Sequence, residues 1–149
     1  MDTQVTQAKS YPTASITRNA AASLVEAARK VADTIGVEVA IAVTDGAGNL
    51  KLFERTDGAH FLTAEVATGK AWTAAAYGIA THVWNAYLTS DPKVAQLAHV
   101  PRLVAVGGGY PIKESGKLVG GIGVSGGTYE QDQDIAETAS RALGFELPA

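Results

Sequence analysis

The glycine-rich stretch at residues 107–127, GGGYPIKESGKLVGGIGVSGG, constrains the fold more than any other feature, because it holds nine of the sixteen glycines. Apolar runs at residues 103–106 and 118–124 predict strands, and Glu114-Ser115-Gly116-Lys117 between them has the composition of a tight turn. Glycine weakens a strand, so its presence indicates that something approaches the backbone closely. We therefore predict two antiparallel strands with a bare end, where glycines leave the backbone without side chains. That end serves either close packing of a helix or an anion site at the amides after Ser125.

The overall composition excludes several classes of protein. A length of 149 residues is typical of one domain, and a net charge of −3 lacks the basic surplus of a nucleic-acid-binding protein. The absence of cysteine excludes disulfides, thiol chemistry and thiolate metal sites. No apolar run reaches membrane-spanning length, and the first fifteen residues lack the apolar core of a signal peptide. We expect a flexible segment over residues 1–15, a single domain over residues 16–149, no nucleic-acid or membrane partner, and a cytoplasmic location.

The first third of the chain predicts a helix followed by a hairpin. Apolar residues recur at helical spacing after Ser15 or Thr17, either of which can cap the helix, and Gly36 is a stop signal. Residues 37–43 alternate between strongly apolar residues and small or polar ones, which is typical of a strand. A turn at residues 45–49 then leads to the partner strand.

A second helix is predicted over Leu62–Tyr77, and one of its faces consists mainly of small residues. The face shared with Lys70 includes Thr63, Ala67 and Thr73. Such a face lets a helix lie close to glycine-rich strands, so we expect Lys70 to be pressed against their bare end. A buried ammonium needs a partner, for which we expect Asp57, Asp45 or an anionic ligand. The alternative is a lysine whose side chain reaches water at the rim of the sheet.

Shorter helices are predicted at residues 81–88 and 92–97, and a final helix begins at a capping box formed by Thr128 and Gln131. The order is then helix, two strands, helices, two strands, helix, with a short fifth strand expected near residues 110–113. This order predicts an α+β fold in which helices cover one antiparallel or mixed sheet.

Five stretches in this order resemble the haem-binding-protein/GlcG family, which includes the C-terminal domain of PduO-type cobalamin adenosyltransferases. The resemblance covers residues 16–143, nearly the whole chain. The matching residues are Asp45-Gly46-Ala47-Gly48, Arg55-Thr56-Asp57-Gly58-Ala59, Gly69-Lys70-Ala71-Trp72-Thr73, Gly107-Gly108-Gly109-Tyr110-Pro111, and Gly120-Gly121-Ile122-Gly123-Val124-Ser125-Gly126-Gly127 with Asp132.

The resemblance implies a profilin-like sandwich, in which helices pack around a five-stranded sheet. It also implies a homo-oligomer, from a dimer to an octamer. The clustering of aromatic residues between Trp72 and Tyr110 is consistent with such an interface.

Members of this family that bind haem are described as using an axial histidine from the first helix. The first helix of this chain, Arg18–Ile35, has no histidine. Among the remaining histidines, His60, which follows the Asp57-Gly58-Ala59 turn, is the preferred haem-ligand candidate, ahead of His82 and His99. No spacing of residues predicts any other metal site.

The leading functional hypothesis is that the chain binds a small, anionic molecule: haem, another tetrapyrrole or a small carboxylate. The small-faced helix and the glycine-rich strands would form a flat slot with apolar walls and a few polar groups. The residues expected to bind the ligand are Lys70, Arg55, Thr73, Gly108, Gly109, Tyr110, Pro111, Ser125 and Gly126.

Two further hypotheses stay open. The first is an enzyme of the lyase or isomerase type that acts on a small hydroxy- or keto-acid without an organic cofactor. Its catalytic residues would be Lys70, Asp57, His60 and Arg55, with Ser125 and the amides after it holding an oxyanion. The second is an accessory protein that works through its oligomer.

Overall fold

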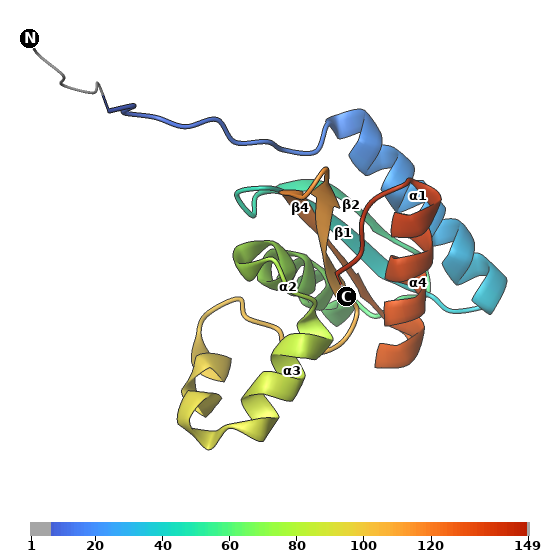
Figure 1. Cartoon of the computed structure of the whole chain (residues 1–149). Coiled ribbons are helices and arrows are strands. Elements are labelled where there is room, and N and C mark those ends of the chain that lie inside the picture. The colour runs from blue at the N-terminus through green and yellow to red at the C-terminus, as the bar shows by residue number, and fades with distance from the viewer. Residues whose placement is uncertain (1–6, 149) are drawn as a thin grey trace, which may run out of the picture.

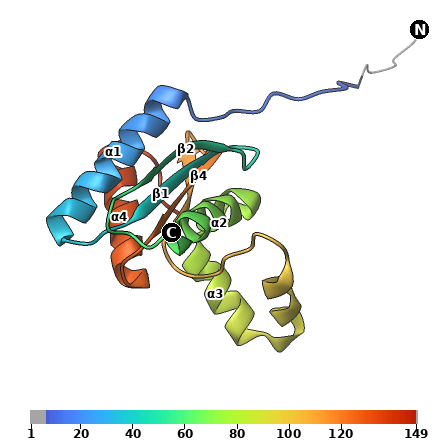
Figure 2. The ribbon, with the colours of Figure 1, turned by 180° about the vertical axis from the view of Figure 1, so that it is seen from behind.

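Helices lie on both faces of one antiparallel sheet (Figures 1 and 2). The structure is a computed structural model and describes residues 7–148. Over these residues the sheet has four strands in the order β2-β1-β4-β3. The elements are α1 (Arg18–Ile35), β1 (Ala40–Asp45), β2 (Leu50–Arg55), α2 (Leu62–Tyr77), α3 (Thr81–Ser90), the 3₁₀ helix η1 (Pro92–His99), β3 (Gly109–Glu114), β4 (Lys117–Ser125) and α4 (Tyr129–Ala142).

The helix ends follow the capping signals of the sequence. Thr17 caps α1 by accepting a hydrogen bond from the Ala20 amide at 3.1 Å, and Gly36 ends it in the left-handed conformation at φ 87°. Thr128 and Gln131 form the predicted capping box of α4. The first strand begins later than predicted, at Ala40, because the Val37 amide still donates to the Ala32 carbonyl at the end of α1.

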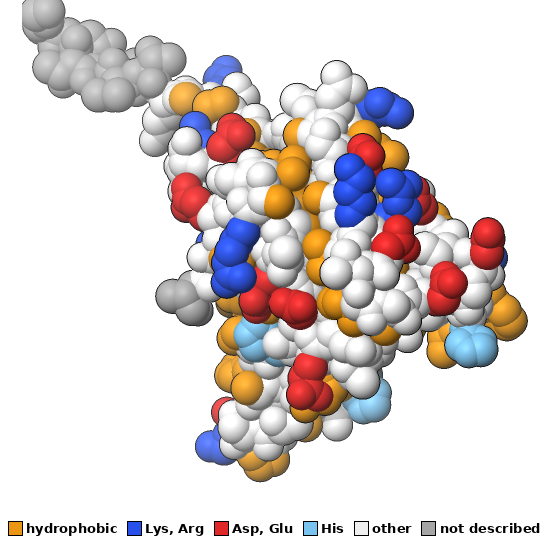
Figure 3. Space-filling model, turned by 90° about the vertical axis from the view of Figure 1, so that its right-hand side faces the viewer, with side chains coloured by type: hydrophobic (Ala, Val, Ile, Leu, Met, Phe, Trp, Pro, Cys, Tyr) orange, Lys and Arg blue, Asp and Glu red, His pale blue; other side chains and the backbone are white. Residues whose placement is uncertain are grey.

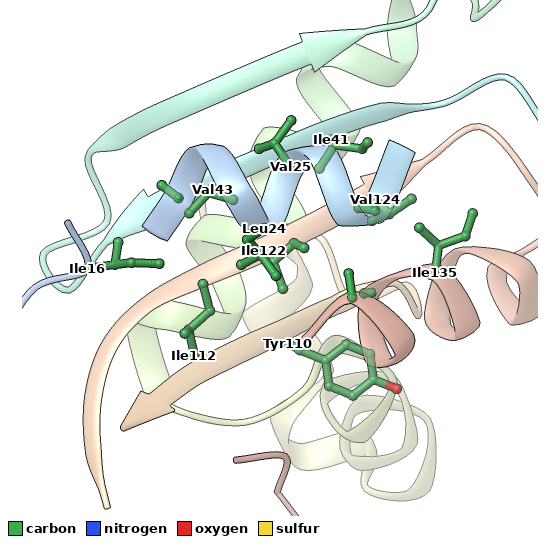
Figure 4. Close-up of a cluster of buried hydrophobic side chains, with 14 of the residues drawn as sticks. Ile16, Leu24, Val25, Ile41, Val43, Tyr110, Ile112, Ile122, Val124 and Ile135 are labelled. Atoms are coloured by element: carbon green, nitrogen blue, oxygen red, sulfur yellow. The ribbon is translucent and has the colours of Figure 1, made fainter. Parts of the chain in front are cut away.

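The main hydrophobic core lies between the sheet and the pair α1 and α4. Figure 4 shows β-branched side chains from β1 and β4 pointing toward Leu24 and Val25 of α1 and toward Ile135 of α4. All of these side chains are buried. Because alternate residues of a strand point to opposite faces, this core uses every second position of the two central strands. Those strand positions are Ile41, Val43, Ile122 and Val124.

The opposite face of the sheet is nearly bare, and α2 lies directly on it. Ala40 and Ala42 of β1 pack against Ala67 and Ala71 of α2. In β4, a Cβ atom on Gly121 or on Gly123 would overlap the carbonyl oxygen of a residue of α2. Gly121 and Gly123 therefore serve close packing of a helix, as one of the two sequence interpretations proposed.

The predicted five-stranded sheet is corrected to four strands within residues 7–148. Residues 103–106 form no strand, because their backbone is engaged elsewhere: the Val104 amide donates to Thr73 Oγ1 of α2 at 2.9 Å, and the Ala105 carbonyl accepts from Asn85 of α3 at 2.9 Å. The short strand expected near residues 110–113 is β3, which pairs with β4 across the predicted turn at residues 114–117.

The outer side of α1 and α4 carries charges of both signs. Figure 3 faces this side of the molecule and shows Lys and Arg side chains interspersed with Asp and Glu. Exposed pairs such as Glu26 with Lys30 on α1, and Glu137 with Arg141 on α4, follow helical spacing.

Residues 7–15 form no helix or strand and leave the body of the domain (Figure 1). The chain joins the sheet at Ile16, whose amide donates to the Val119 carbonyl at 2.9 Å. The predicted flexibility of residues 1–15 stays a prediction, and residues 1–6 lie outside the described part of the chain. Among the described residues, none of the helices combines the length and the apolar character needed to span a bilayer.

Candidate functional site

Lys70 is buried at the bare end of the sheet, with 2% of its surface exposed, as the small face of α2 predicted. Its Nζ donates to the Val124 carbonyl at 2.8 Å and to Asp132 Oδ2 at 3.1 Å. The second carboxylate oxygen of Asp132 accepts from the Gly127 amide at 3.0 Å. The ion pair is therefore held by hydrogen bonds on both of its partners, which a buried pair requires.

Gly108 covers this ion pair and must be glycine for that reason. Its φ of 125° belongs to a region that L side chains rarely adopt, and a Cβ atom would lie 2.8 Å from Lys70 Nζ. Its carbonyl accepts from the Val124 amide at 2.9 Å. Gly108 is thus part of the wall around Lys70 and Asp132 rather than an open cradle for a ligand.

Burial shifts the two ionisable groups of the pair in opposite directions. It lowers the pKa of Lys70, and the charge and hydrogen bond of Asp132 oppose that shift. It raises the pKa of Asp132, and the charge of Lys70 and the amide of Gly127 oppose that shift. Desolvation disfavours the charged form of either group, so each one needs the other to stay ionised.

The predicted partners of Lys70 were wrong. Asp132 of α4 holds it, whereas Asp57 and Asp45 lie at the ends of the β1–β2 hairpin. The Asp45 carboxylate accepts from the backbone amides of its own turn, at Ala47 and Asn49. The sequence signal for Asp132 was weak, because an acidic residue in the first turn of a helix is common for its favourable interaction with the helix dipole.

The flat slot expected between α2 and the glycine-rich strands is filled by the helix itself. A Cβ atom on Gly109 would lie 2.6 Å from the Lys70 carbonyl oxygen, and Pro111 pairs with Gly121 on the same covered face. Tyr110 points to the other face, where its phenol donates to Glu137 of α4. The residues at positions 109–111 are therefore not brought together around a cavity.

Three other predicted residues lie at the end of β2 and on the connection to α2, and all three are exposed. Arg55 donates to the Ala59 carbonyl at 2.6 Å, and the His60 carbonyl accepts from Thr63 Oγ1 at 2.6 Å. Asp57 lies between them in the sequence. Ser125 belongs to the same end of the sheet, since Arg55 and Ser125 both pair with Ala40.

The amides proposed to hold an oxyanion are not free for that purpose. The Gly127 amide donates to Asp132 at 3.0 Å, and a backbone hydrogen bond from Gly126 also lowers the pKa of this carboxyl, against the effect of burial. Thr73 has a structural partner as well: its hydroxyl accepts from the Val104 amide at 2.9 Å and donates to the Arg102 carbonyl at 3.3 Å. Thr73 therefore fixes the loop at residues 102–104 on α2.

A cavity lies elsewhere, between the edge strand β2, the first half of α2 and the loop fixed by Thr73. Its volume is about 620 Å³, within the range of small-molecule pockets. Two of the ten lining residues, Glu65 and Arg102, are charged. The others are Leu50, Phe53, Leu62, Ala64, Val66, Thr68, Gly69 and Val104.

Sequence reasoning missed every residue of this pocket. The sequence pattern predicts that Leu50 and Phe53 are ordinary strand residues and that residues 103–106 form a strand of their own. Leu50, Phe53 and Leu62 are exposed in the structure, and their exposure cannot be seen in the sequence. His60 lies two positions before the lining residue Leu62 but does not itself line the pocket. The residues that the structure describes contain no group of three or more His, Asp or Glu side chains placed to hold a metal ion.

The structure is a small α+β domain with an apolar pocket at the edge of its sheet, and comparison with known proteins gives its family. A family model described as haem degrading protein HbpS-like matches residues 16–141. The chain belongs to this HbpS-like family.

Two relatives show how the domain occurs in other chains. A 15.0 kDa protein from the dhaT-dhaS intergenic region of Citrobacter freundii is 38% identical over 133 residues, covering 88% of this chain and 94% of that protein. The corrinoid adenosyltransferase PduO of the same organism is 36% identical over 140 residues, covering 93% of this chain. This chain spans only 42% of that PduO protein.

Solved structures share the fold. Protein ORFY of Klebsiella pneumoniae superimposes with a TM-score of 0.88 at 32% identity, covering 94% of this chain and 98% of that one. A PduOC:heme complex gives 0.80 at 32% identity, covering 91% and 99%. HbpS gives 0.85 at 30% identity, covering 95% and 99%. The predicted α+β fold, which in the structure has four antiparallel strands and helices, is thus similar to the HbpS structures.

Proposed function

We propose that this chain binds a flat, mostly apolar small molecule of the tetrapyrrole type in the pocket between β2 and α2. The observation that carries the proposal is the pocket itself: about 620 Å³ with only two charged lining residues. Apolar walls with a few placed polar groups are typical of small-molecule sites. One of the related structures, PduOC, is a complex with heme, which supports this class of ligand.

The lining residues fit the macrocycle of a haem better than its iron. Leu50, Phe53 and Val66 offer apolar surface to a flat ring. None of the ten lining residues is histidine, methionine, tyrosine or cysteine, the usual axial ligands of haem iron. His60, the sequence candidate, is exposed on the connection just before α2. The proposal therefore rests on the ring and its substituents.

The alternative of an enzyme that uses Lys70 has less support. The Lys70 ammonium is engaged by Val124 and Asp132 inside the protein, and Lys70 does not line the pocket. Arg55 at the end of β2, and Asp57 and His60 on the connection that follows it, are exposed, and none of them lines the pocket. Ligand binding is thus the better-supported function, and the expected cytoplasmic location stays a prediction.

The test is a titration of the purified protein with haem and with metal-free protoporphyrin IX, followed by the quenching of tryptophan fluorescence. Val66→Trp fills the pocket and is expected to weaken binding at least about tenfold, since a filled cavity excludes the ring. Val83→Trp is the matched control, because Val83 is an exposed valine on α3 outside the pocket.

Wild-type protein that binds neither porphyrin would end the proposal. Binding that Val66→Trp leaves as strong as in the wild type would place the ligand elsewhere on the chain. Circular dichroism of both tryptophan variants establishes that they are folded before either result is interpreted.

A further inference from the structure

Arg102 is a cation at the pocket without an anionic partner in the described part of the protein. It lines the cavity, and no carboxylate of residues 7–148 forms an ion pair with it. Its guanidinium carbon lies 4.8 Å from the centre of the Trp72 ring, a cation–π arrangement. A guanidinium that stacks on an aromatic face keeps its N–H groups available in the plane of the fork.

The Trp72 ring is itself fixed in position. On the β1–β2 turn, Gly48 has φ 85°, and a Cβ atom at this position would lie 3.0 Å from Trp72 Cδ1. The turn therefore packs its backbone directly against the indole. Turn, indole and guanidinium form a stack that joins the hairpin to the loop at residues 102–104.

The backbone of Arg102 is held in an uncommon conformation. Its φ of 73° lies in the left-handed region, which is unfavourable for a residue with a side chain. Thr73 Oγ1 holds the chain just after this position, at the Arg102 carbonyl and the Val104 amide, and the Leu103 amide donates to the Val100 carbonyl at 3.1 Å. Strained backbone that the surroundings hold in place is concentrated at functional sites.

We infer that Arg102 is the specificity-determining residue of the pocket and that it recognises a carboxylate on the ligand. This inference rests on the proposed function. The guanidinium fork matches a carboxylate in two hydrogen bonds, and the propionate-like substituents of a tetrapyrrole carry such groups at one edge of a flat ring. Stacking on Trp72 holds the guanidinium in position before the ligand arrives, so little side-chain entropy is lost on binding.

Glu65 sets the direction in which such a ligand lies. It is the other charged lining residue and belongs to the first turn of α2, whereas Gly69, beside the Arg102 loop, lies one turn further along. A carboxylate of the ligand is attracted by Arg102 and repelled by Glu65. The apolar edge of the ring therefore lies toward Glu65 and Leu62, and the anionic edge toward Arg102.

The experiment compares protoporphyrin IX with its dimethyl ester, which has the same ring without the charges. We expect the wild type to bind the free acid about tenfold or more tightly than the ester, the scale of a charged hydrogen bond. Arg102→Met is expected to abolish this preference by weakening the binding of the free acid, and Arg102→Lys is expected to keep part of the preference. Glu65→Gln is the matched control, with an expected effect of the opposite sign: stronger binding of the acid.

The outcomes separate this inference from the proposed function. Arg102→Met protein that still prefers the acid as strongly as the wild type overturns the inference, even where Val66→Trp blocks binding and the pocket proposal stands. Equal binding of acid and ester by the wild type overturns it as well. If neither porphyrin binds, the proposed function fails and the inference fails with it. Arg102→Lys keeps the test decisive should Arg102→Met not fold.

Discussion

The side chains of Lys70 and Asp132, 62 positions apart in the sequence, form a buried ion pair at 3.1 Å that joins the two layers of helices. Lys70 belongs to α2 on one face of the sheet, and Asp132 belongs to α4 on the other (Figure 1). The pair meets at the end of β4, where the Val124 carbonyl accepts from the same ammonium. It therefore fixes the two layers at this end of the sheet, which is a structural role.

Lys70→Met should destabilise the protein, because it leaves the Asp132 carboxylate buried without its cation. Breaking a buried pair in this way costs about 3–5 kcal/mol. The double variant Lys70→Met/Asp132→Asn removes both charges, while the oxygen of the new side-chain amide can still accept from the Gly127 amide. It should therefore regain more than half of the loss. Urea denaturation of the wild type, the single variant and the double variant measures this.

A double variant no more stable than Lys70→Met alone would contradict the coupling. Porphyrin binding supplies the functional control. Lys70 does not line the pocket, so Lys70→Met protein that remains folded should keep its affinity for porphyrin. A lysine that held the ligand would give the opposite result, a loss of binding.

Gly123→Ala should also be strongly destabilising, since its Cβ atom would overlap the Ala67 carbonyl of α2. Neither partner can move easily, because both are backbone, and overpacking of this kind typically costs about 1–3 kcal/mol or more. Gly116→Ala is the control. It lies in the β3–β4 turn with no atom near the added methyl group, so only its φ of 75° opposes the change.

Thermal unfolding should show a larger loss of stability for Gly123→Ala than for Gly116→Ala. Equal losses would mean that backbone conformation alone accounts for the glycines and that α2 is not seated against β4 as the structure has it.

The course of the chain was largely predictable, because it depends on local signals. The helical period of small residues on α2 predicted that Lys70 is buried, and the capping residues Thr17 and Thr128 predicted two helix starts. The partner of Lys70 was not predictable, because many acidic residues lie near the ends of elements and only the fold selects Asp132. The pocket was missed for a related reason: Val104 has the character of a strand residue until Thr73 is seen to hold its amide.

Tyr110 should resist ionisation in the native protein. Burial raises the pKa of its phenol above the ordinary 10.0, and its hydrogen bond to Glu137 adds to the shift. Because the folded-state pKa is raised above that of the unfolded chain, the stabilisation is present in full below about pH 10 and is lost as pH rises through the folded-state pKa.

An ultraviolet titration of tyrosinate tests this expectation. Tyr110 is buried and should ionise in a late step, only above the ordinary pH range of a phenol or with unfolding. Tyr110→Phe should remove this late step. A wild type without a late step would show that Tyr110 is not buried as described.

The homo-oligomer expected from the sequence remains a prediction, and exposed aromatic residues give a way to test it. Tyr77 packs edge-on against Trp84 at 5.6 Å between ring centres, yet its own surface is 74% exposed. Aromatic side chains are enriched at interface cores. We expect light scattering to give a mass above the 15.3 kDa of one chain, and Tyr77→Ser to lower it. A wild type that measures as a monomer would refute this.

Metal-free protoporphyrin IX should bind about as tightly as haem, within a few-fold. The physical reason is the composition of the pocket, whose ten lining residues lack the side chains that usually ligate haem iron. The affinity then comes from burial of the ring and from the charged groups at its edge, which the two ligands share. His60→Ala is the matched variant, because His60 is the histidine nearest in sequence to the lining residue Leu62 and is itself exposed. If haem binds much more tightly than the metal-free ring, and His60→Ala removes the difference together with a shifted Soret band, then His60 ligates the iron and the entry to α2 must move toward the pocket.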